Sequence, residues 1–210
     1  MKTKVAVFIF FAHIFIFCAV CSAAHINGLY NTGVDDYGNA LTAGTIDAHY
    51  TLAGPSSPAY ATDENPAWVP APLNSSWIGP VNAAGSAFVG TYNYSATFDL
   101  SGFDISTAYI SGKWASDNHG YIYLNNMLID NNIGYEFTVI RNFYIDQYFV
   151  EGENTLTFTV VNYTETPNPT GLLVFDIMGE VQEFAPAPIP EPATILFFLA
   201  GLLIRKLIKK

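Results

Sequence analysis

The fold is decided by the stretch Phe88-Val-Gly-Thr-Tyr-Asn-Tyr-Ser-Ala-Thr-Phe98, in which large and small or polar side chains alternate. Tyr92, Tyr94, Ala96 and Phe98 fall on one face of an extended chain. Because successive side chains of a strand point to opposite sides, this pattern indicates a β-strand with one buried face. We therefore expect a strand of an antiparallel sheet that is packed on one side.

Similar short runs recur along the chain and are separated by Gly, Asn, Asp and Pro, whereas helical periodicity and helix caps are missing. The expected strands are Ala43–Leu52, Ala108–Trp114 (Ala108, Ile110, Gly112 and Trp114 on one face), Gly120–Leu124 (Ile122 and Leu124 inward), Phe137–Ile145, Leu156–Val160 (apolar residues alternating with Thr155, Thr157 and Thr159) and a fully buried Leu172–Ile177. Asn125 and Asn126 should form one turn and residues 151–154 another. Between residues 53 and 85, six prolines predict a long irregular crossing. The pattern predicts an all-β, antiparallel β-sandwich over residues 25–184.

The charges of the 210-residue chain are unevenly distributed. Of eight basic residues, only Lys113 and Arg141 lie between residues 25 and 190, where they face 17 acidic residues, a net charge of −15. Such a body repels phosphate backbones, which argues against a nucleic-acid partner.

The first 24 residues have the pattern of a secretory signal peptide. Lys2 and Lys4 precede the apolar run Val5–Val20, and small residues follow up to Ala24, after which we expect cleavage. Cys18 and Cys21 both lie in this leader, so the exported domain should contain no disulfide. The alternative is an uncleaved signal anchor, because the apolar run is long.

The C-terminus has three parts. A proline-rich linker, residues 185–192, ends in Pro190, Glu191 and Pro192. The segment 193–210 follows and is the expected membrane anchor. It begins with the apolar run Ala193–Ile204 and ends with a basic tail that contains Arg205, Lys206, Lys209 and Lys210. As a helix the apolar run is about 18 Å long, against a hydrocarbon core of about 30 Å, so it predicts a marginal transmembrane helix. The basic residues should stop translocation and stay in the cytoplasm.

This tail resembles the PEP-CTERM sorting domain of Gram-negative bacteria. The resemblance implies that an exosortase recognises the Pro-Glu-Pro motif and removes the anchor, so that the protein is held briefly in the inner membrane and then passed to the cell surface or the extracellular matrix. An ordinary tail anchor is the alternative.

A second set of stretches lies within the body: Asn31–Asp35, Asp47–Tyr50, Phe98–Leu100, Gly112–Asn118, Leu124–Asn125 and Gly152–Leu156. In these stretches the body resembles the body domains of PEP-CTERM proteins and, through them, galactose-binding-like jelly rolls. The resemblance implies a jelly-roll-like sandwich and also suggests a structural calcium ion.

No catalytic motif is visible: the body has no cysteine, no zinc-protease histidine spacing, no nucleophile elbow and no phosphate loop. The best candidate for ligand binding is the turn between two strands formed by Asp117, Asn118 and His119, with Tyr121 pointing outward beside it. A solvated hairpin without a ligand is the simpler interpretation. Trp114 should lie in the core, and Trp68 and Trp77 should either pin the proline-rich crossing or form a stacking platform.

Asp35 and Asp36 are the candidate residues for a structural calcium site, since carboxylates and turn carbonyls suit that ion. No other cofactor is expected. The leading functional hypothesis is an exported, non-enzymatic component of the cell surface or of an exopolysaccharide matrix. A carbohydrate-binding module for matrix polysaccharide is the first alternative. A hydrolase, or an ice-binding protein that uses the threonine row, is a more distant one.

Overall fold

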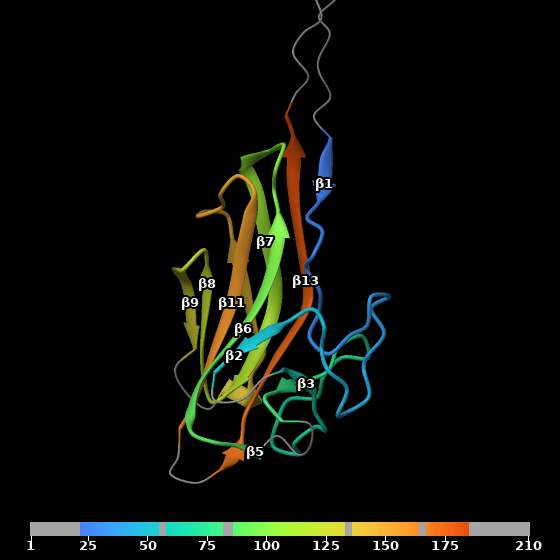
Figure 1. Cartoon of the computed structure of the whole chain (residues 1–210), viewed down its shortest axis with the longest axis vertical. Helices are drawn as coiled ribbons and strands as arrows, with labels where there is room; N and C mark the ends of the chain where they lie inside the picture. The colour runs from blue at the N-terminus through green and yellow to red at the C-terminus, as the bar shows by residue number, and fades with distance from the viewer. Residues whose placement is uncertain (1–21, 55–57, 82–85, 133–135, 164–166, 185–210) are drawn as a thin grey trace, which may run out of the picture. The chain divides into compact units, whose positions relative to one another are not determined.

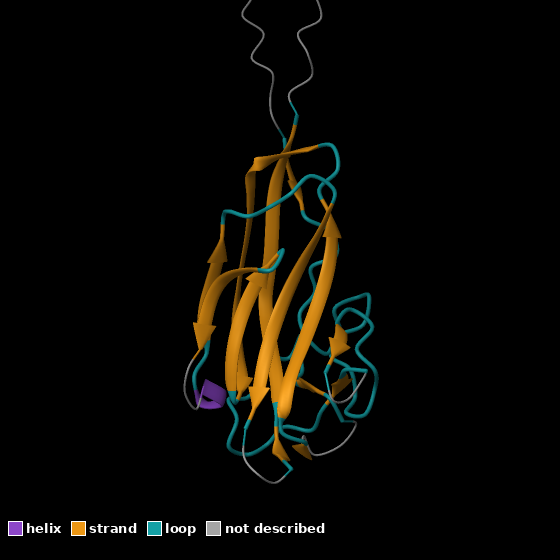
Figure 2. Cartoon of the chain, turned by 60° about the vertical axis from the view of Figure 1, so that its left-hand side comes forward, coloured by secondary structure: helices purple, strands orange, loops and turns teal. Residues whose placement is uncertain are grey.

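The computed structural model describes residues 22–54, 58–81, 86–132, 136–163 and 167–184, all within one unit, Ser22–Phe184. Two antiparallel sheets pack face to face (Figure 1), and strands dominate the described residues (Figure 2). The six-stranded sheet contains β1 (Ala23–His25), β3 (Tyr60–Ala61), β4 (Ile78–Gly79), β7 (Phe103–Asp117), β10 (Arg141–Ile145) and β13 (Gly171–Glu183). The five-stranded sheet contains β2 (Thr51–Ala53), β6 (Gly90–Asp99), β8 (His119–Leu124), β9 (Met127–Asn132) and β11 (Glu153–Asn162). The predicted all-β, antiparallel sandwich is confirmed.

Two smaller elements complete the described part of the chain. β5 (Ser86–Ala87) pairs with β12 (Asn168–Pro169), and a single 3-10 turn, η1, spans Glu136–Thr138. The expected signal peptide up to residue 21, the proline-rich linker with the Pro-Glu-Pro motif and the expected C-terminal anchor lie outside the described residues.

The longer strands pair in a nested order. β8 pairs with the adjacent β9, β7 with β10, β6 with β11, and β1 with β13, all antiparallel. Each of these pairs encloses the next one along the chain. From β6 to β13 the longer strands alternate between the two sheets, except that the innermost pair, β8 and β9, lies in one sheet.

The core lies between the sheets and contains the inward side chains that the alternation predicted. Tyr92 and Tyr94 of β6 are fully buried, as are Ile110 and Trp114 of β7. The ring of Phe158 in β11 lies 6.1 Å from that of Trp114, centroid to centroid, and so joins the two layers. These predicted inward faces are confirmed.

One glycine in β8 makes room for the largest core side chain. Gly120 faces Trp114, and a Cβ at this position would overlap the indole ring. Gly120 therefore allows the backbone of β8 to approach the ring closely, which no larger residue would permit.

The proline-rich crossing covers part of the outer face of the six-stranded sheet. Trp68 and Trp77 from the crossing form a second buried cluster with three outward residues of β7 and β13, namely Ala115, Leu173 and Phe175. The Trp68 and Trp77 rings lie 4.4 Å apart. The two tryptophans thus pin the crossing to the sheet, as one of the two alternatives predicted.

Three strand predictions need correction. The strand expected over Ala43–Leu52 is reduced to Thr51–Ala53, because Gly44 turns with a φ of +89° and the Asp47 side chain bonds backbone N–H groups that a ladder would need. The strand expected from Phe137 begins only at Arg141, since Phe137 belongs to η1 and packs on the second cluster. The buried run at Leu172 continues to Glu183 through an irregularity at Asp176, where φ is +51°.

The turn at Asn125 and Asn126 is confirmed. Both residues have positive φ, 50° and 66°, which is the conformation of a tight two-residue hairpin turn. The Asn125 side chain donates to the carbonyl of Tyr148 and to Oδ1 of the buried Asn154, so this hairpin is tied to the turn before β11.

Candidate functional site

The segment expected to bind a ligand, Asp117–His119, connects the two sheets and is not a hairpin. β7 ends at Asp117 in one sheet, and β8 begins at His119 in the other. Asp117 and Asn118 are both buried, with 5% and 7% of their surface exposed. The expectation of a solvent-facing turn is therefore wrong for these two residues, because a connection between packed layers lies at their margin and other segments cover it.

Every polar atom of the Asp117 carboxylate has a partner. The indole N–H of Trp68 donates to Oδ2 at 2.7 Å, and the Asn118 amide donates to Oδ1 at 2.6 Å. The hydroxyl of Thr170 donates to the Asp117 carbonyl oxygen. Burial raises the pKa of Asp117 to about 6, and the hydrogen bond from Trp68 opposes this shift. The hydrogen bond from Trp68 thus connects the proline-rich crossing to the end of β7. Because both oxygens of this buried carboxylate have partners, Asp117 is not available to a ligand.

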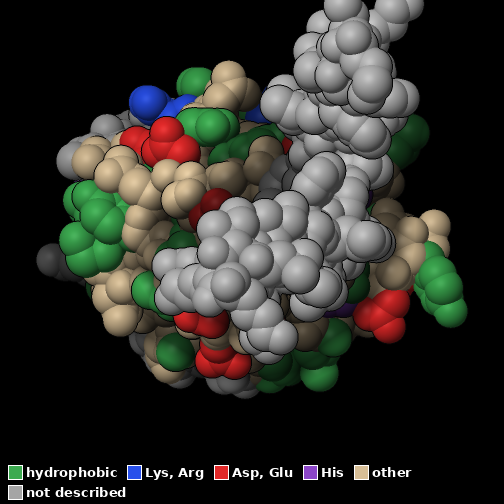
Figure 3. All heavy atoms as spheres, turned by 90° about the horizontal axis from the view of Figure 1, so that it is seen from above, with side chains coloured by type: hydrophobic (Ala, Val, Ile, Leu, Met, Phe, Trp, Pro, Cys, Tyr) green, Lys and Arg blue, Asp and Glu red, His purple; other side chains and the backbone are tan. Residues whose placement is uncertain are grey.

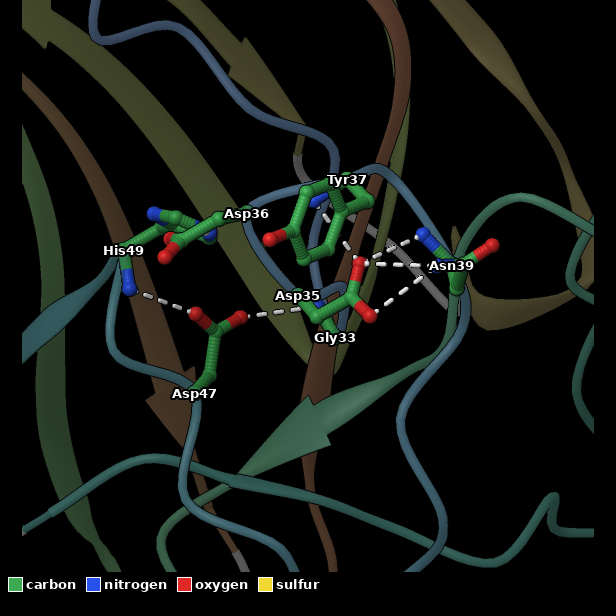
Figure 4. A network of polar contacts seen from close by, with 7 residues as sticks. All are labelled: Gly33, Asp35, Asp36, Tyr37, Asn39, Asp47 and His49. Carbon is green, nitrogen blue, oxygen red and sulfur yellow. Dashed lines mark hydrogen bonds and ion pairs between the residues drawn. The ribbon is translucent and has the colours of Figure 1, made fainter.

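The acidic residues near the N-terminus point in different directions (Figure 4). Asp35 is half-buried and accepts hydrogen bonds from the backbone N–H groups of Tyr37 and Asn39 and from the Asn39 amide. These donors hold the pKa of Asp35 below its usual value. Asp36 instead lies 3.5 Å from Nε2 of His49.

This arrangement does not fit a calcium ion at Asp35 and Asp36. N–H donors occupy Oδ1 of Asp35, the Asn39 amide also contacts Oδ2, and the carboxylates of Asp35 and Asp36 do not converge on one point. Within the described ranges, no group of three or more His, Cys, Asp or Glu side chains is placed to hold a metal.

The most buried carboxylate of this region is one that the sequence did not single out. Asp47 is 2% exposed; its Oδ2 accepts from the N–H of Gly33 at 2.7 Å, and its Oδ1 accepts from the N–H of His49 at 2.8 Å. Burial raises its pKa. The bond to His49, two residues on, is an Asx turn that a sequence can suggest, whereas the bond to Gly33 depends on the tertiary fold. Asp47 therefore stabilises the N-terminal loops through these two hydrogen bonds.

His119 and Tyr121 belong to a different surface, the outer face of the five-stranded sheet. We call this surface the hydroxyl face. Its members alternate with the core residues of β6, β11 and β8, and they are Thr91, Asn93, Ser95, Thr97, Thr155, Thr157, Thr159, Val161, His119, Tyr121 and Tyr123. All of them are half-buried or exposed. The outward direction predicted for Tyr121 and Tyr123 is confirmed.

The strand register arranges the hydroxyl face in rows. One row contains Ser95, Thr157 and Tyr123, and the next contains Asn93, Thr159 and Tyr121. Hydroxyl oxygens of Ser95 and Thr157 lie 2.9 Å apart, and the Thr159 hydroxyl donates to Oδ1 of Asn93 at 2.7 Å. These cross-strand bonds fix the positions of the side chains, and the remaining lone pairs stay available to a ligand.

The hydroxyl face has no carboxylate or ammonium group between its first and last rows. The carboxylates of Asp99 and Glu153 stand opposite one another beyond Thr97 and Thr155, at one end of the face. On the neighbouring strand β9, the half-buried Asp130 pairs with Ile122, the residue between Tyr121 and Tyr123. Both basic residues of the body, Lys113 and Arg141, belong to the other sheet. Figure 3, a view from one end of the molecule, shows acidic side chains scattered over the surface and basic ones confined to one side. The hydroxyl face is thus a neutral surface on an acidic protein.

The chain matches no protein-family model and no curated protein. Among the residues that the structure describes, no helix is long and apolar enough to cross a membrane.

Proposed function

We propose that this protein is an exported, non-enzymatic component of the cell surface or of an exopolysaccharide matrix. The observation that carries the proposal is the position of the two ends of the folded unit. β1 and β13 are antiparallel neighbours, so Ser22 and Glu183 lie together, and the N–H of Glu183 donates to the carbonyl of Ser22 at 3.4 Å. The segments before Ser22 and after Phe184 therefore start from one end of the sandwich, which suits a domain displayed from a membrane.

Processing of the leader after Ala24 affects only the edge of the fold. Ala23 and Ala24 pair with Gln182 and Val181 of β13, and cleavage at this position would leave His25 alone of the three residues of β1. The buried Ile26 just beyond it donates its N–H to the carbonyl of Gly179, so the chain stays attached to β13 after cleavage. Export with signal removal is compatible with this sheet.

We further propose that the sandwich is a jelly roll, as the sequence resemblance implies. The nested pairing of β1 with β13, β6 with β11, β7 with β10 and β8 with β9 supports this assignment, because wrapping one long antiparallel ribbon around a core produces that order.

Sorting is assigned to Pro190, Glu191 and Pro192, with an exosortase as the processing partner and the inner membrane as the transient site of anchoring. The test is Glu191→Ala in a host that contains exosortase. We expect the variant to insert normally, since the residue lies outside the apolar run, and to accumulate in the membrane as the longer form. Glu151→Ala, at an exposed turn of the folded unit, is the matched control and should be processed normally.

The result that would overturn the sorting proposal comes from the wild-type protein. If mass spectrometry of the mature form from such a host finds the peptide with Arg205, Lys206, Lys209 and Lys210, the tail is an ordinary anchor. In that case the protein is a permanent membrane-attached domain.

A second candidate function is carbohydrate binding, which the hydroxyl face favours. Trp68, Trp77 and Trp114 are buried and therefore cannot stack on a sugar ring. The candidates for stacking are instead the tyrosines of the hydroxyl face. A hydrolase would need two carboxylates that converge in a cleft. Asp35 and Asp36 diverge, Asp47 and Asp117 are buried with partners, and the facing pair Asp99 and Glu153 is exposed at the end of a sheet. Ice binding has less support, because Thr155, Thr157 and Thr159 form a single row on one strand, and threonine is a common outward residue of strands.

A further inference from the structure

The two outer faces of the sandwich differ in what they present. Part of the six-stranded sheet is covered by the crossing, and the outward Lys113 of this sheet pairs with Asp176 at 2.8 Å. Apart from Val161, the hydroxyl face of the other sheet presents hydroxyl, amide, imidazole and phenol groups. Neutral surfaces of this kind are selective by shape and hydrogen bonding, since they have little charge with which to attract a partner.

The charge of the rest of the body limits which ligand this face can take. With 17 acidic residues against two basic ones, the domain repels polyanions at long range. A cationic ligand would be drawn to Asp99 and Glu153 or to the other exposed acids, and not to the hydroxyl rows. The ligand that suits the rows is therefore uncharged and rich in hydrogen-bonding groups.

Two tyrosines add flat apolar surface to the rows. The Tyr121 and Tyr123 rings lie 6.4 Å apart, centroid to centroid, and are inclined by 34°. Each ring has a threonine directly opposite it in the register, Thr159 beside Tyr121 and Thr157 beside Tyr123. A sugar ring has an apolar C–H face and a rim of hydroxyls, so it can stack on a phenol ring while its rim bonds the neighbouring threonine.

We propose that the hydroxyl face binds a neutral polysaccharide, with Tyr121 and Tyr123 stacking on sugar rings and Thr157 and Thr159 bonding their hydroxyls. This inference deepens the proposed function, on which it rests: it makes the protein a matrix component that attaches to uncharged glycan chains. The rows run across three hydrogen-bonded strands, roughly 10 Å, so each row is long enough to contact about two sugar units of an extended chain.

The test is native affinity electrophoresis of the full-length chain purified in detergent. Gels contain one dissolved neutral polysaccharide each (dextran, mixed-linkage β-glucan, xylan or galactomannan), and a parallel gel contains the anionic polysaccharide alginate. We expect at least one neutral polysaccharide to retard the protein and alginate to have no effect.

Variants assign the binding to the hydroxyl face. The double variant Tyr121→Thr, Tyr123→Thr keeps strand-forming residues and should weaken binding about tenfold or more. Tyr121→Phe keeps the ring and should retain most of the affinity, whereas Thr159→Val, which removes one hydroxyl at similar volume, should weaken it several-fold. Tyr144→Thr is the matched control, because Tyr144 is a 59% exposed tyrosine on β10 of the other sheet; it should bind like the wild type.

The proposal is overturned if none of the four neutral polysaccharides retards the wild-type chain, if alginate retards it equally, or if Tyr144→Thr weakens binding as much as the double variant. If the double variant does not fold, the affinities of the single variants Tyr121→Phe and Thr159→Val for the polysaccharide take its place as the test. In that case, a Thr159→Val variant that binds as tightly as the wild type refutes the proposal. Sorting is measured in cells by the mass of the mature protein, so failure of glycan binding and failure of the proposed export route are separate results.

Discussion

Removing one buried hydroxyl should leave this protein as stable as before or more stable. Tyr94 is fully buried between the sheets, and its Oη has no hydrogen-bond partner among the described residues. Two residues earlier in β6, the equally buried Tyr92 donates its hydroxyl to the carbonyl of Phe88 at 2.8 Å. The two tyrosines share a strand, a face and a core, and they differ in whether the hydroxyl is bonded.

The expected free energies follow from that difference. A buried hydroxyl without a partner costs about 1–3 kcal/mol, so Tyr94→Phe should raise the free energy of unfolding by about 1 kcal/mol, since the ring keeps its packing. Tyr92→Phe should lower it by about 1 kcal/mol, because the Phe88 carbonyl loses its donor. Tyr50→Phe, at a hydroxyl that donates to the carbonyl of Tyr30 at 2.7 Å, should lower it by a similar amount.

The assay is urea unfolding of the unit Ser22–Phe184, followed by the fluorescence of its three buried tryptophans. The midpoint should shift upward for Tyr94→Phe and downward for the two control variants, at constant slope. If Tyr94→Phe destabilises the protein as much as Tyr92→Phe does, the Tyr94 hydroxyl is bonded, for example to a buried water, and the reasoning is refuted.

The other predictions concern the core, the connection between the sheets and the N-terminal loops. Gly120→Ala should destabilise the unit by about 1–3 kcal/mol, measured in the same assay, because a Cβ there meets the Trp114 ring; a neutral result would mean that the ring can move. Asp117, whose pKa lies at about 6 in the folded protein against an ordinary 3.8, binds a proton in the native state that the unfolded chain has released between these pH values. The stabilisation that this proton gives to the folded state is therefore present at low pH and is lost as the pH rises through about 6. Asp117→Asn should flatten the pH dependence of the melting temperature between pH 4 and pH 7. An unchanged slope in the variant would contradict this prediction. Millimolar calcium should leave the melting temperature unchanged, since N–H donors occupy Asp35; a clear rise would restore the calcium site that the sequence suggested.

Local sequence patterns were enough to predict the class of fold and the inward faces of the strands. Alternation has a period of two residues, and this local property is enough to place Tyr92, Tyr94, Ile110, Trp114 and their counterparts in a core. The Asn125–Asn126 turn was predictable for the same reason, because two adjacent residues provide the positive φ values. The alternation did not reveal β1, which has three residues and depends on pairing with β13 at the far end of the chain.

The burial of the expected ligand turn depends on tertiary contacts. Asp117 is buried because Trp68, 49 residues earlier, and Thr170, 53 residues later, bond to it, and no local pattern contains that information. The same holds for Asp47, which is distinguished from the other acids by Gly33. The hydroxyl face also required the structure: Thr157, Tyr123 and Ser95 are recognisable as outward residues of three separate strands, but only the pairing of those strands sets them side by side. Side-chain direction is a local consequence of backbone geometry, whereas strand order and loop packing depend on contacts between distant segments, and the candidate site is made of such contacts.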